Sequence, residues 1–146
     1  SLKITPENLQ TAISNLEYVP HRLEYIKGRI NILDDSYNCS IVSATESIKV
    51  LLNCPNKNMV VTPGIIEGGK QQYELNFKLG KLIANCDNIV IVGAYCKQAL
   101  TAGIKDAVPT KKILYAQSLE DAKQYFKILS NNDTLLLLND LPDDYN

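Results

Sequence analysis

Short apolar segments alternate with longer amphipathic segments along most of this chain. The apolar segments are four or five residues long and rich in Val, Ile and Leu, which is typical of buried β-strands. They predict strands at residues 58–62, 89–92, 113–116 and 134–138. The segments between them repeat their apolar residues every three or four positions, and they predict helices at 41–53, 70–85, 97–104 and 119–129. Ser40 and Ser118 are the expected N-caps of the first and last of these helices.

The first forty residues follow a different pattern. A short helix is expected over residues 6–16, with Thr5 as its N-cap and Pro6 at its first helical position. Residues 22–26 and 30–33 then resemble two strands of a hairpin that turns around Gly28.

The later strands are apolar on both faces and are separated by helices, which indicates a parallel sheet covered on both sides. The expected fold class is therefore α/β. Because strand–helix–strand crossovers are right-handed, a doubly wound layer structure is favoured. We predict a Rossmann-like three-layer domain with a mostly parallel sheet of about six strands and helices on both faces. No internal repeat or long linker divides the chain.

Composition and charge narrow the possible partners. The 146 residues carry 15 basic and 16 acidic side chains, for a net charge of −1, so no nucleic acid or anionic membrane is expected as a partner. The apolar runs are too short to cross a bilayer. The four cysteines have no zinc-binding spacing and His21 is the only histidine, so we expect no metal site and reduced, mostly buried thiols in a cytoplasmic protein.

Candidate chemistry lies at the carboxyl ends of the strands, where ligands gather in open parallel sheets. Four segments end there: 34–38, 62–64, 93–95 and 116–118. The first is the most polar. A carboxylate of Asp34 or Asp35 could accept hydrogen bonds from ribose hydroxyls or hold a cation, or it could only satisfy backbone donors of the turn. Spacing alone leaves these alternatives open.

Two further charged residues are candidates. Arg22 could bind phosphate through its planar guanidinium, although an arginine at the start of a strand is more often a solvated surface residue. Glu67, in a glycine-rich loop, could face a substrate or the solvent. The chain contains no phosphate-binding loop and no dinucleotide-binding glycine motif, so tight nucleotide binding by this chain alone is not expected.

Three blocks of sequence, in this order, resemble the C-terminal domain of the Mur ligases. They are VPHRLE at 19–24, ILDDSYN at 32–38 and VTPGIIEGG at 61–69. The second block is most similar to the family members that add D-alanyl-D-alanine. The resemblance covers almost the whole chain. It implies that residues 1–20 are a linker or helix from a preceding central domain and that residues 21–146 are the Mur ligase C-terminal domain.

The resemblance also implies a function. Mur ligases use ATP and Mg²⁺ to join an amino acid or dipeptide to a UDP-muramoyl peptide in peptidoglycan synthesis. The ATP and Mg²⁺ are bound mainly by the central domain, and the N-terminal domain holds the UDP substrate. The C-terminal domain closes over both.

Site residues carry over from the family motifs. Arg22 would approach the ATP phosphates and Asp35 the ribose, and Tyr37 and Asn38 would line the same cleft. Gly64 and Glu67 would lie near the incoming substrate. Alone, the domain is expected to be inactive and to bind ATP at millimolar affinity or weaker. In the intact ligase, Arg22→Ala or Asp35→Ala is expected to reduce turnover without unfolding the domain.

The sequence departs from the family pattern at two places. Ser40-Ile41 replaces the usual Asn-Pro at the start of a helix, and Asn139-Asp140 follows the last strand where many members carry Lys-Gly-Ser-Arg. The sequence therefore does not identify the incoming substrate. Two other functions are alternatives. The first is a receiver-like signalling domain, which would use the paired acids to hold magnesium but needs an aspartate where Thr62 ends a strand. The second is a non-catalytic nucleotide-sensing module.

Overall fold

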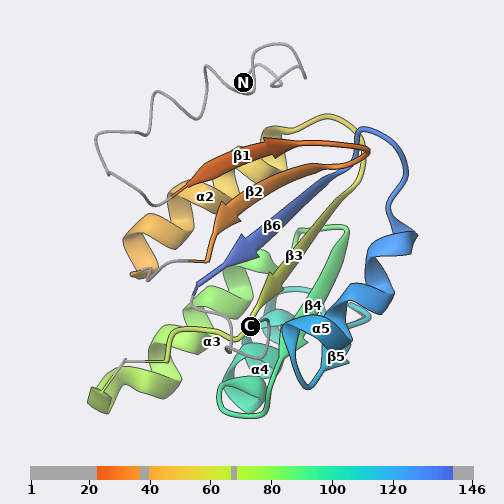
Figure 1. Cartoon of the computed structure of the whole chain (residues 1–146). Coiled ribbons are helices and arrows are strands. Elements are labelled where there is room, and N and C mark those ends of the chain that lie inside the picture. Colours follow the sequence, from red (N-terminus) through yellow and green to blue (C-terminus); the bar gives the residue numbers. More distant parts are fainter. Residues whose placement is uncertain (1–22, 37–39, 67–68, 140–146) are drawn as a thin grey trace.

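The fold is built on one six-stranded sheet. The computed structural model describes residues 23–36, 40–66 and 69–139 (Figure 1). The strand order is β1-β2-β6-β3-β4-β5, and every neighbouring pair is parallel except β1 with β2. The strands are β1 Glu24–Lys27, β2 Asn31–Asp35, β3 Asn58–Thr62, β4 Asn88–Val92, β5 Leu114–Ala116 and β6 Thr134–Leu138.

Helices cover both faces of this sheet. One face carries α2 (Ile41–Asn53), α3 (Gln72–Ile83) and α4 (Lys97–Ala107), with the short 3₁₀ helix η2 (Gly69–Gln71) leading into α3. The other face carries α5 (Leu119–Ala122) and the 3₁₀ helix η3 (Lys123–Ile128). The predicted three-layer α/β architecture is therefore confirmed.

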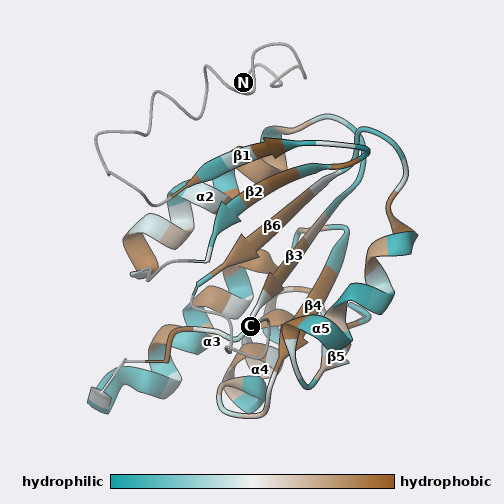
Figure 2. Ribbon diagram, in the orientation of Figure 1, coloured by the Kyte–Doolittle hydropathy of each residue, from teal (hydrophilic) through white to brown (hydrophobic). Residues whose placement is uncertain are grey.

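The core consists of two apolar layers, one on each side of the sheet. In β3, Val60 belongs to the layer under α2, α3 and α4, whereas Met59 and Val61 belong to the layer under α5 and η3. All five residues of β3 are buried, because a strand at the centre of a doubly covered sheet has no solvent face. In Figure 2 the central strands are mostly brown, because most of their residues are hydrophobic.

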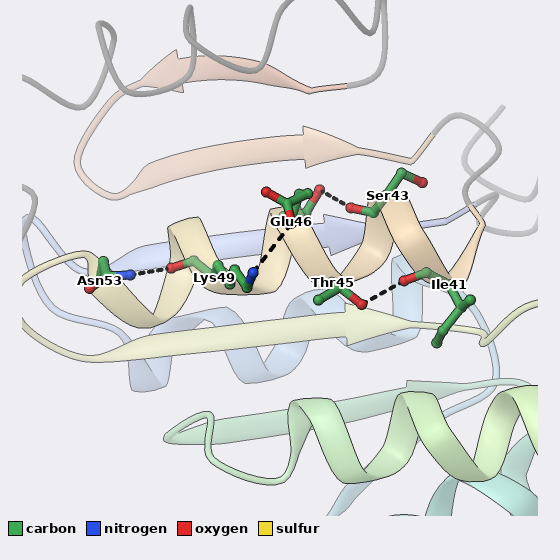
Figure 3. A network of polar contacts seen from close by, with 7 residues as sticks. Ile41, Ser43, Thr45, Glu46, Lys49 and Asn53 are labelled. Carbon is green, nitrogen blue, oxygen red and sulfur yellow. Dashed lines mark hydrogen bonds and ion pairs between the residues drawn. The ribbon is translucent and has the colours of Figure 1, made fainter. Parts of the chain in front are cut away.

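Local signals position α2. Ser40 forms a capping box, in which its hydroxyl accepts from the Ser43 amide (3.2 Å) and its own amide donates to Ser43 Oγ (3.0 Å). Further along, Thr45 Oγ1 donates to the Ile41 carbonyl, and an ion pair joins Lys49 to Glu46 (Figure 3). The predicted bounds and N-cap of this helix are correct.

Other predicted bounds were less accurate. The helix expected at 70–85 begins with the 3₁₀ turn η2, and α4 continues three residues beyond its predicted end. The helix expected at 119–129 is α-helical only to Ala122 and then tightens into η3, where Tyr125 Oη donates to the Tyr115 carbonyl (3.1 Å). Contacts with the sheet override helical periodicity there. The helix expected at 6–16 and the division at residue 20 lie outside the described residues.

The described cysteines are free and buried: Cys54, Cys86 and Cys96. Burial raises the pKa of all three thiols, and that of Cys86 to about 12. Cys39 lies outside the described residues. None of the described helices is long and apolar enough to cross a membrane.

This burial predicts low thiol reactivity. In the native Cys39→Ser variant at pH 8, no thiol is expected to react with a disulfide reagent within minutes, because neutral buried thiols are poor nucleophiles. In denaturant all three should react. A folded pKa above the unfolded value of 9.0 also means that unfolding releases protons, so stability should fall as pH rises from about 9 to about 12. Rapid labelling of one native thiol would show that its burial is not maintained in solution.

Candidate functional site

The carboxyl ends of β2, β6 and β3 form the candidate site. These three strands are neighbours in the sheet, although β6 is the last strand in the sequence (Figure 1). The loops that follow β2 and β3 carry the residues predicted to contact ligands. Because β6 lies between the two strands, the residue that follows β6 is placed to contact both loops.

The two acids at the end of β2 have different roles. Adjacent residues of a strand point to opposite faces, and Asp34 and Asp35 do so. Asp34 is half-buried and accepts hydrogen bonds from the amide and the hydroxyl of Ser36, which is the turn role considered for it. Asp35 is only 1% exposed and faces α2, where its Oδ2 accepts from Ser47 Oγ at 2.6 Å.

Ser47 explains how this buried carboxylate is held. It lies on the inner face of α2, 3% exposed, at a position where a helix usually carries an apolar residue. Its hydroxyl joins the helix to the end of β2. Because the Asp35 side chain is buried in this conformation, a ligand could contact its carboxylate only after the residues that cover it move.

Gly64 follows β3 and is tightly enclosed. Its φ of +90° is favourable only for glycine, and an added Cβ would lie 2.5 Å from Asn76 Oδ1 and 2.6 Å from Cys96 Cβ. Its amide donates to Thr62 Oγ1 at 3.0 Å. The next residue, Ile65, exchanges two hydrogen bonds with the side chain of Asn76, at 2.8 and 2.9 Å. The loop is therefore a rigid unit attached to α3.

Asn139 connects the end of β2 to the loop after β3, a role that the sequence did not reveal. It follows β6 with a φ of +70° and is 4% exposed. Its backbone amide donates to the Asp35 carbonyl at 2.8 Å, and its side-chain Nδ2 donates to the Gly64 carbonyl. Asparagine directly after an apolar strand is the one available signal, because asparagine tolerates positive φ better than most residues.

The structure thus brings together two of the predicted site residues, Asp35 and Gly64, on either side of β6. The other four lie outside the described residues: Arg22, Tyr37, Asn38 and Glu67.

A hollow lies further along the same edge of the sheet. It has a volume of about 510 Å³ and lies where β4 and β5 end, lined among others by Gly93, Lys97, Tyr115 and Asp121. Lys97 Nζ lies 4.5 Å from the centre of the Tyr115 ring, a cation–π contact. Of the predicted site residues that the structure describes, neither Asp35 nor Gly64 lines this hollow.

Comparisons with known proteins find relatives of similar sequence and overall fold. No family model matches the chain. The curated UDP-N-acetylmuramoyl-tripeptide–D-alanyl-D-alanine ligase of Escherichia coli (strain K12) is 29% identical over 106 residues, which cover 70% of this chain and 24% of that protein. A crystal structure of MurF from Acinetobacter baumannii is 26% identical with a TM-score of 0.61, over 82% of this chain and 27% of that one.

A second similar structure is MurF from Thermotoga maritima in complex with ADP. It is 24% identical with a TM-score of 0.62, over 95% of this chain and 28% of that one. The chain therefore spans about a quarter of the length of each of these relatives.

Proposed function

This chain has the fold and the sequence features of a Mur ligase C-terminal domain, and we propose that it is the closing domain of an ATP-dependent amide-bond-forming ligase. The reaction we propose is the addition of D-alanyl-D-alanine to a UDP-muramoyl-tripeptide in peptidoglycan precursor synthesis. The similarity to the Escherichia coli enzyme of that name supports this choice of substrate.

The observation that carries the proposal is the arrangement at the carboxyl ends of β2, β6 and β3. Two blocks that resemble the family, at 32–38 and 61–69, are far apart in the sequence, yet they flank one strand. Asn139 fastens them to each other through Asp35 and Gly64. A switch in strand order of this kind, at the carboxyl edge of a parallel sheet, is where α/β proteins bind ligands.

Each residue has a proposed task. Arg22 would bind the ATP phosphates, because a guanidinium donates two parallel hydrogen bonds and keeps its charge. Asp35 would accept hydrogen bonds from the ribose; its carboxylate is a suitable acceptor, although it must first be uncovered. Tyr37 and Asn38 would line the same cleft, and Gly64 and Glu67 would lie near the incoming amino component.

ATP, when bound with Mg²⁺, supplies the phosphoryl group that activates the acceptor carboxylate. We propose that both are held mainly by the central domain of the parent ligase, since this chain contains no phosphate-binding loop. The contribution of this domain would be to orient the substrates and exclude water when it closes. Because this chain lacks a phosphate-binding loop, the domain alone should bind ATP only at about millimolar affinity or weaker.

The geometry of the acids argues against the receiver-like alternative. Such a domain needs neighbouring carboxylates that share one cation, but Asp34 and Asp35 point to opposite faces of the sheet. The strand end where an acceptor aspartate would be required holds Thr62, which is completely buried.

The test is an assay of the full-length polypeptide that carries this domain. Ligation and ATP hydrolysis are measured with UDP-muramoyl-tripeptide and D-alanyl-D-alanine, and again after deletion of the domain. Product formation that the deletion abolishes is the expected result. ATP hydrolysis without acceptance of the dipeptide would leave a Mur-type ligase with another substrate, and no ligation with any muramoyl peptide would overturn the proposal.

A further inference from the structure

We infer that Asn139 is a positioning residue of the proposed ligase site, which sets the loop after β3 relative to the carboxyl end of β2. The inference rests on the proposed function for its catalytic meaning. Its structural content concerns only described residues, so the two can be tested separately.

The position of Asn139 in the sheet makes this role possible. Asp35 ends β2 and Gly64 follows β3, and these two strands do not pair with each other because β6 separates them. Asn139 is the first residue beyond β6, and its left-handed backbone turns the chain there. Its amide donates to the Asp35 carbonyl, while its side chain donates to the Gly64 carbonyl.

Contacts other than that of Asn139 also hold this loop. Gly64 has no space for a Cβ, its amide is held by Thr62, and Ile65 is held by both polar atoms of the Asn76 side chain. Loss of the Asn139 side chain should therefore leave the loop folded on α3, but local opening of the loop should become more frequent because one of the hydrogen bonds that hold it is lost. The change should be in where the whole loop lies relative to Asp35 and β2.

Burial makes the contact consequential. Asn139 is 4% exposed, and the Gly64 residue that accepts its hydrogen bond is buried. Once the side chain is removed, the Gly64 carbonyl must find another donor, because an unsatisfied buried acceptor is unfavourable. A small shift of the loop toward solvent is the simplest way to provide one. A displacement of about 1 Å at a substrate-positioning element can reduce an enzymatic rate by up to about 100-fold.

The same contact bears on how this chain differs from the family pattern. Many Mur ligases carry the lysine of Lys-Gly-Ser-Arg after the last strand, whereas the amide of Asn139 here points inward to the neighbouring loop.

The test variant is Asn139→Gly. Glycine accepts a φ of +70° and keeps the backbone amide that donates to Asp35, so the variant removes the side-chain hydrogen bond to Gly64 and retains the backbone hydrogen bond. The matched control is Asn132→Gly. Asn132 has nearly the same backbone conformation, with a φ of +72°, but it is exposed in the loop before β6, at the opposite end of that strand.

Two measurements are made on each variant. In this chain, amide hydrogen exchange of Gly64 and Ile65 should accelerate by about tenfold in Asn139→Gly and stay unchanged in Asn132→Gly. In the full-length ligase, well below the unfolding temperature, kcat/KM for the incoming dipeptide should fall about tenfold or more in Asn139→Gly only. Loss of stability alone would not move the kinetics of molecules that remain folded.

The outcomes separate the two proposals. Unchanged exchange and kinetics equal to those of Asn132→Gly would overturn the positioning role. If the exchange changes but kcat/KM does not, Asn139 is structural and the inference about the site is wrong. If the wild-type ligase shows no ligation, the proposed function fails, and the exchange of Gly64 and Ile65 alone decides whether Asn139 positions the loop.

Discussion

Replacing Gly103 with alanine is expected to destabilise the domain by about 2 kcal/mol or more, despite the better helix propensity of alanine. A Cβ on Gly103, in α4, would overlap the carbonyl oxygen of Phe77 in α3 and would lie 3.1 Å from the Lys81 amide nitrogen. Gly80 makes the reciprocal contact, because its Cβ would lie 3.0 Å from the Ile104 nitrogen. Backbone atoms cannot move away by changing rotamer, so the two helices would have to separate.

The measurement is thermal and denaturant unfolding. For a domain of this size, 2 kcal/mol corresponds to a fall in Tm of roughly 4–8 °C. The matched control is Gln98→Ala, on the exposed surface of the same helix, which should change stability by less than about 0.5 kcal/mol. A stabilised Gly103→Ala variant would mean that helix propensity outweighs packing and that α3 and α4 are not in close contact.

In the full-length ligase, Arg22→Ala is expected to reduce turnover by about 100- to 1,000-fold. That is the usual effect of removing one group that stabilises charge in a closed active site. The control is Arg29→Ala. Arg29 lies in the turn between β1 and β2, at the end of β2 opposite to Asp35, where its guanidinium donates to the Leu129 carbonyl at 2.8 Å. Turnover of the control should stay within about twofold of wild type.

Asp35→Ala should be distinguishable from Arg22→Ala, because the structure revises the expectation for Asp35. Substitution of either residue was expected to spare the fold. Asp35 is buried, however, and its loss would leave the Ser47 hydroxyl without this acceptor. We therefore expect Asp35→Ala to reduce both turnover and the free energy of unfolding, the latter by about 2 kcal/mol. Near-normal turnover in both variants would contradict the proposed ATP contacts.

Local sequence signals were sufficient for most secondary structure. The bounds predicted for α2, β3 and β6 agree with the structure, because each is fixed by neighbouring residues: a serine cap for α2, and a short apolar run for each of the two strands. Predictions failed where distant contacts decide. The segment that contains η3 reads as one continuous helix, but hydrogen bonding to the sheet changes its winding after Ala122.

The same distinction between local signals and distant contacts applies to the candidate site. The sequence identified Asp35 and Gly64 as residues at strand ends, which needs only the order of elements along the chain and the family motifs. It could not reveal that Asp35 faces α2, that Gly64 is enclosed by Asn76 and Cys96, or that Asn139 joins the two loops.

The sequence by itself determined the alternation of strands and helices, the covered parallel sheet and the resemblance to Mur ligases. These follow from hydrophobic periodicity and motif spacing, which act over a few residues. The tertiary structure decided that β6 returns between β2 and β3. Only that insertion places Asn139, more than seventy residues after Gly64, in hydrogen-bond contact with its carbonyl. Strand order depends on long-range pairing, and the local pattern of a strand does not specify its neighbours in the sheet.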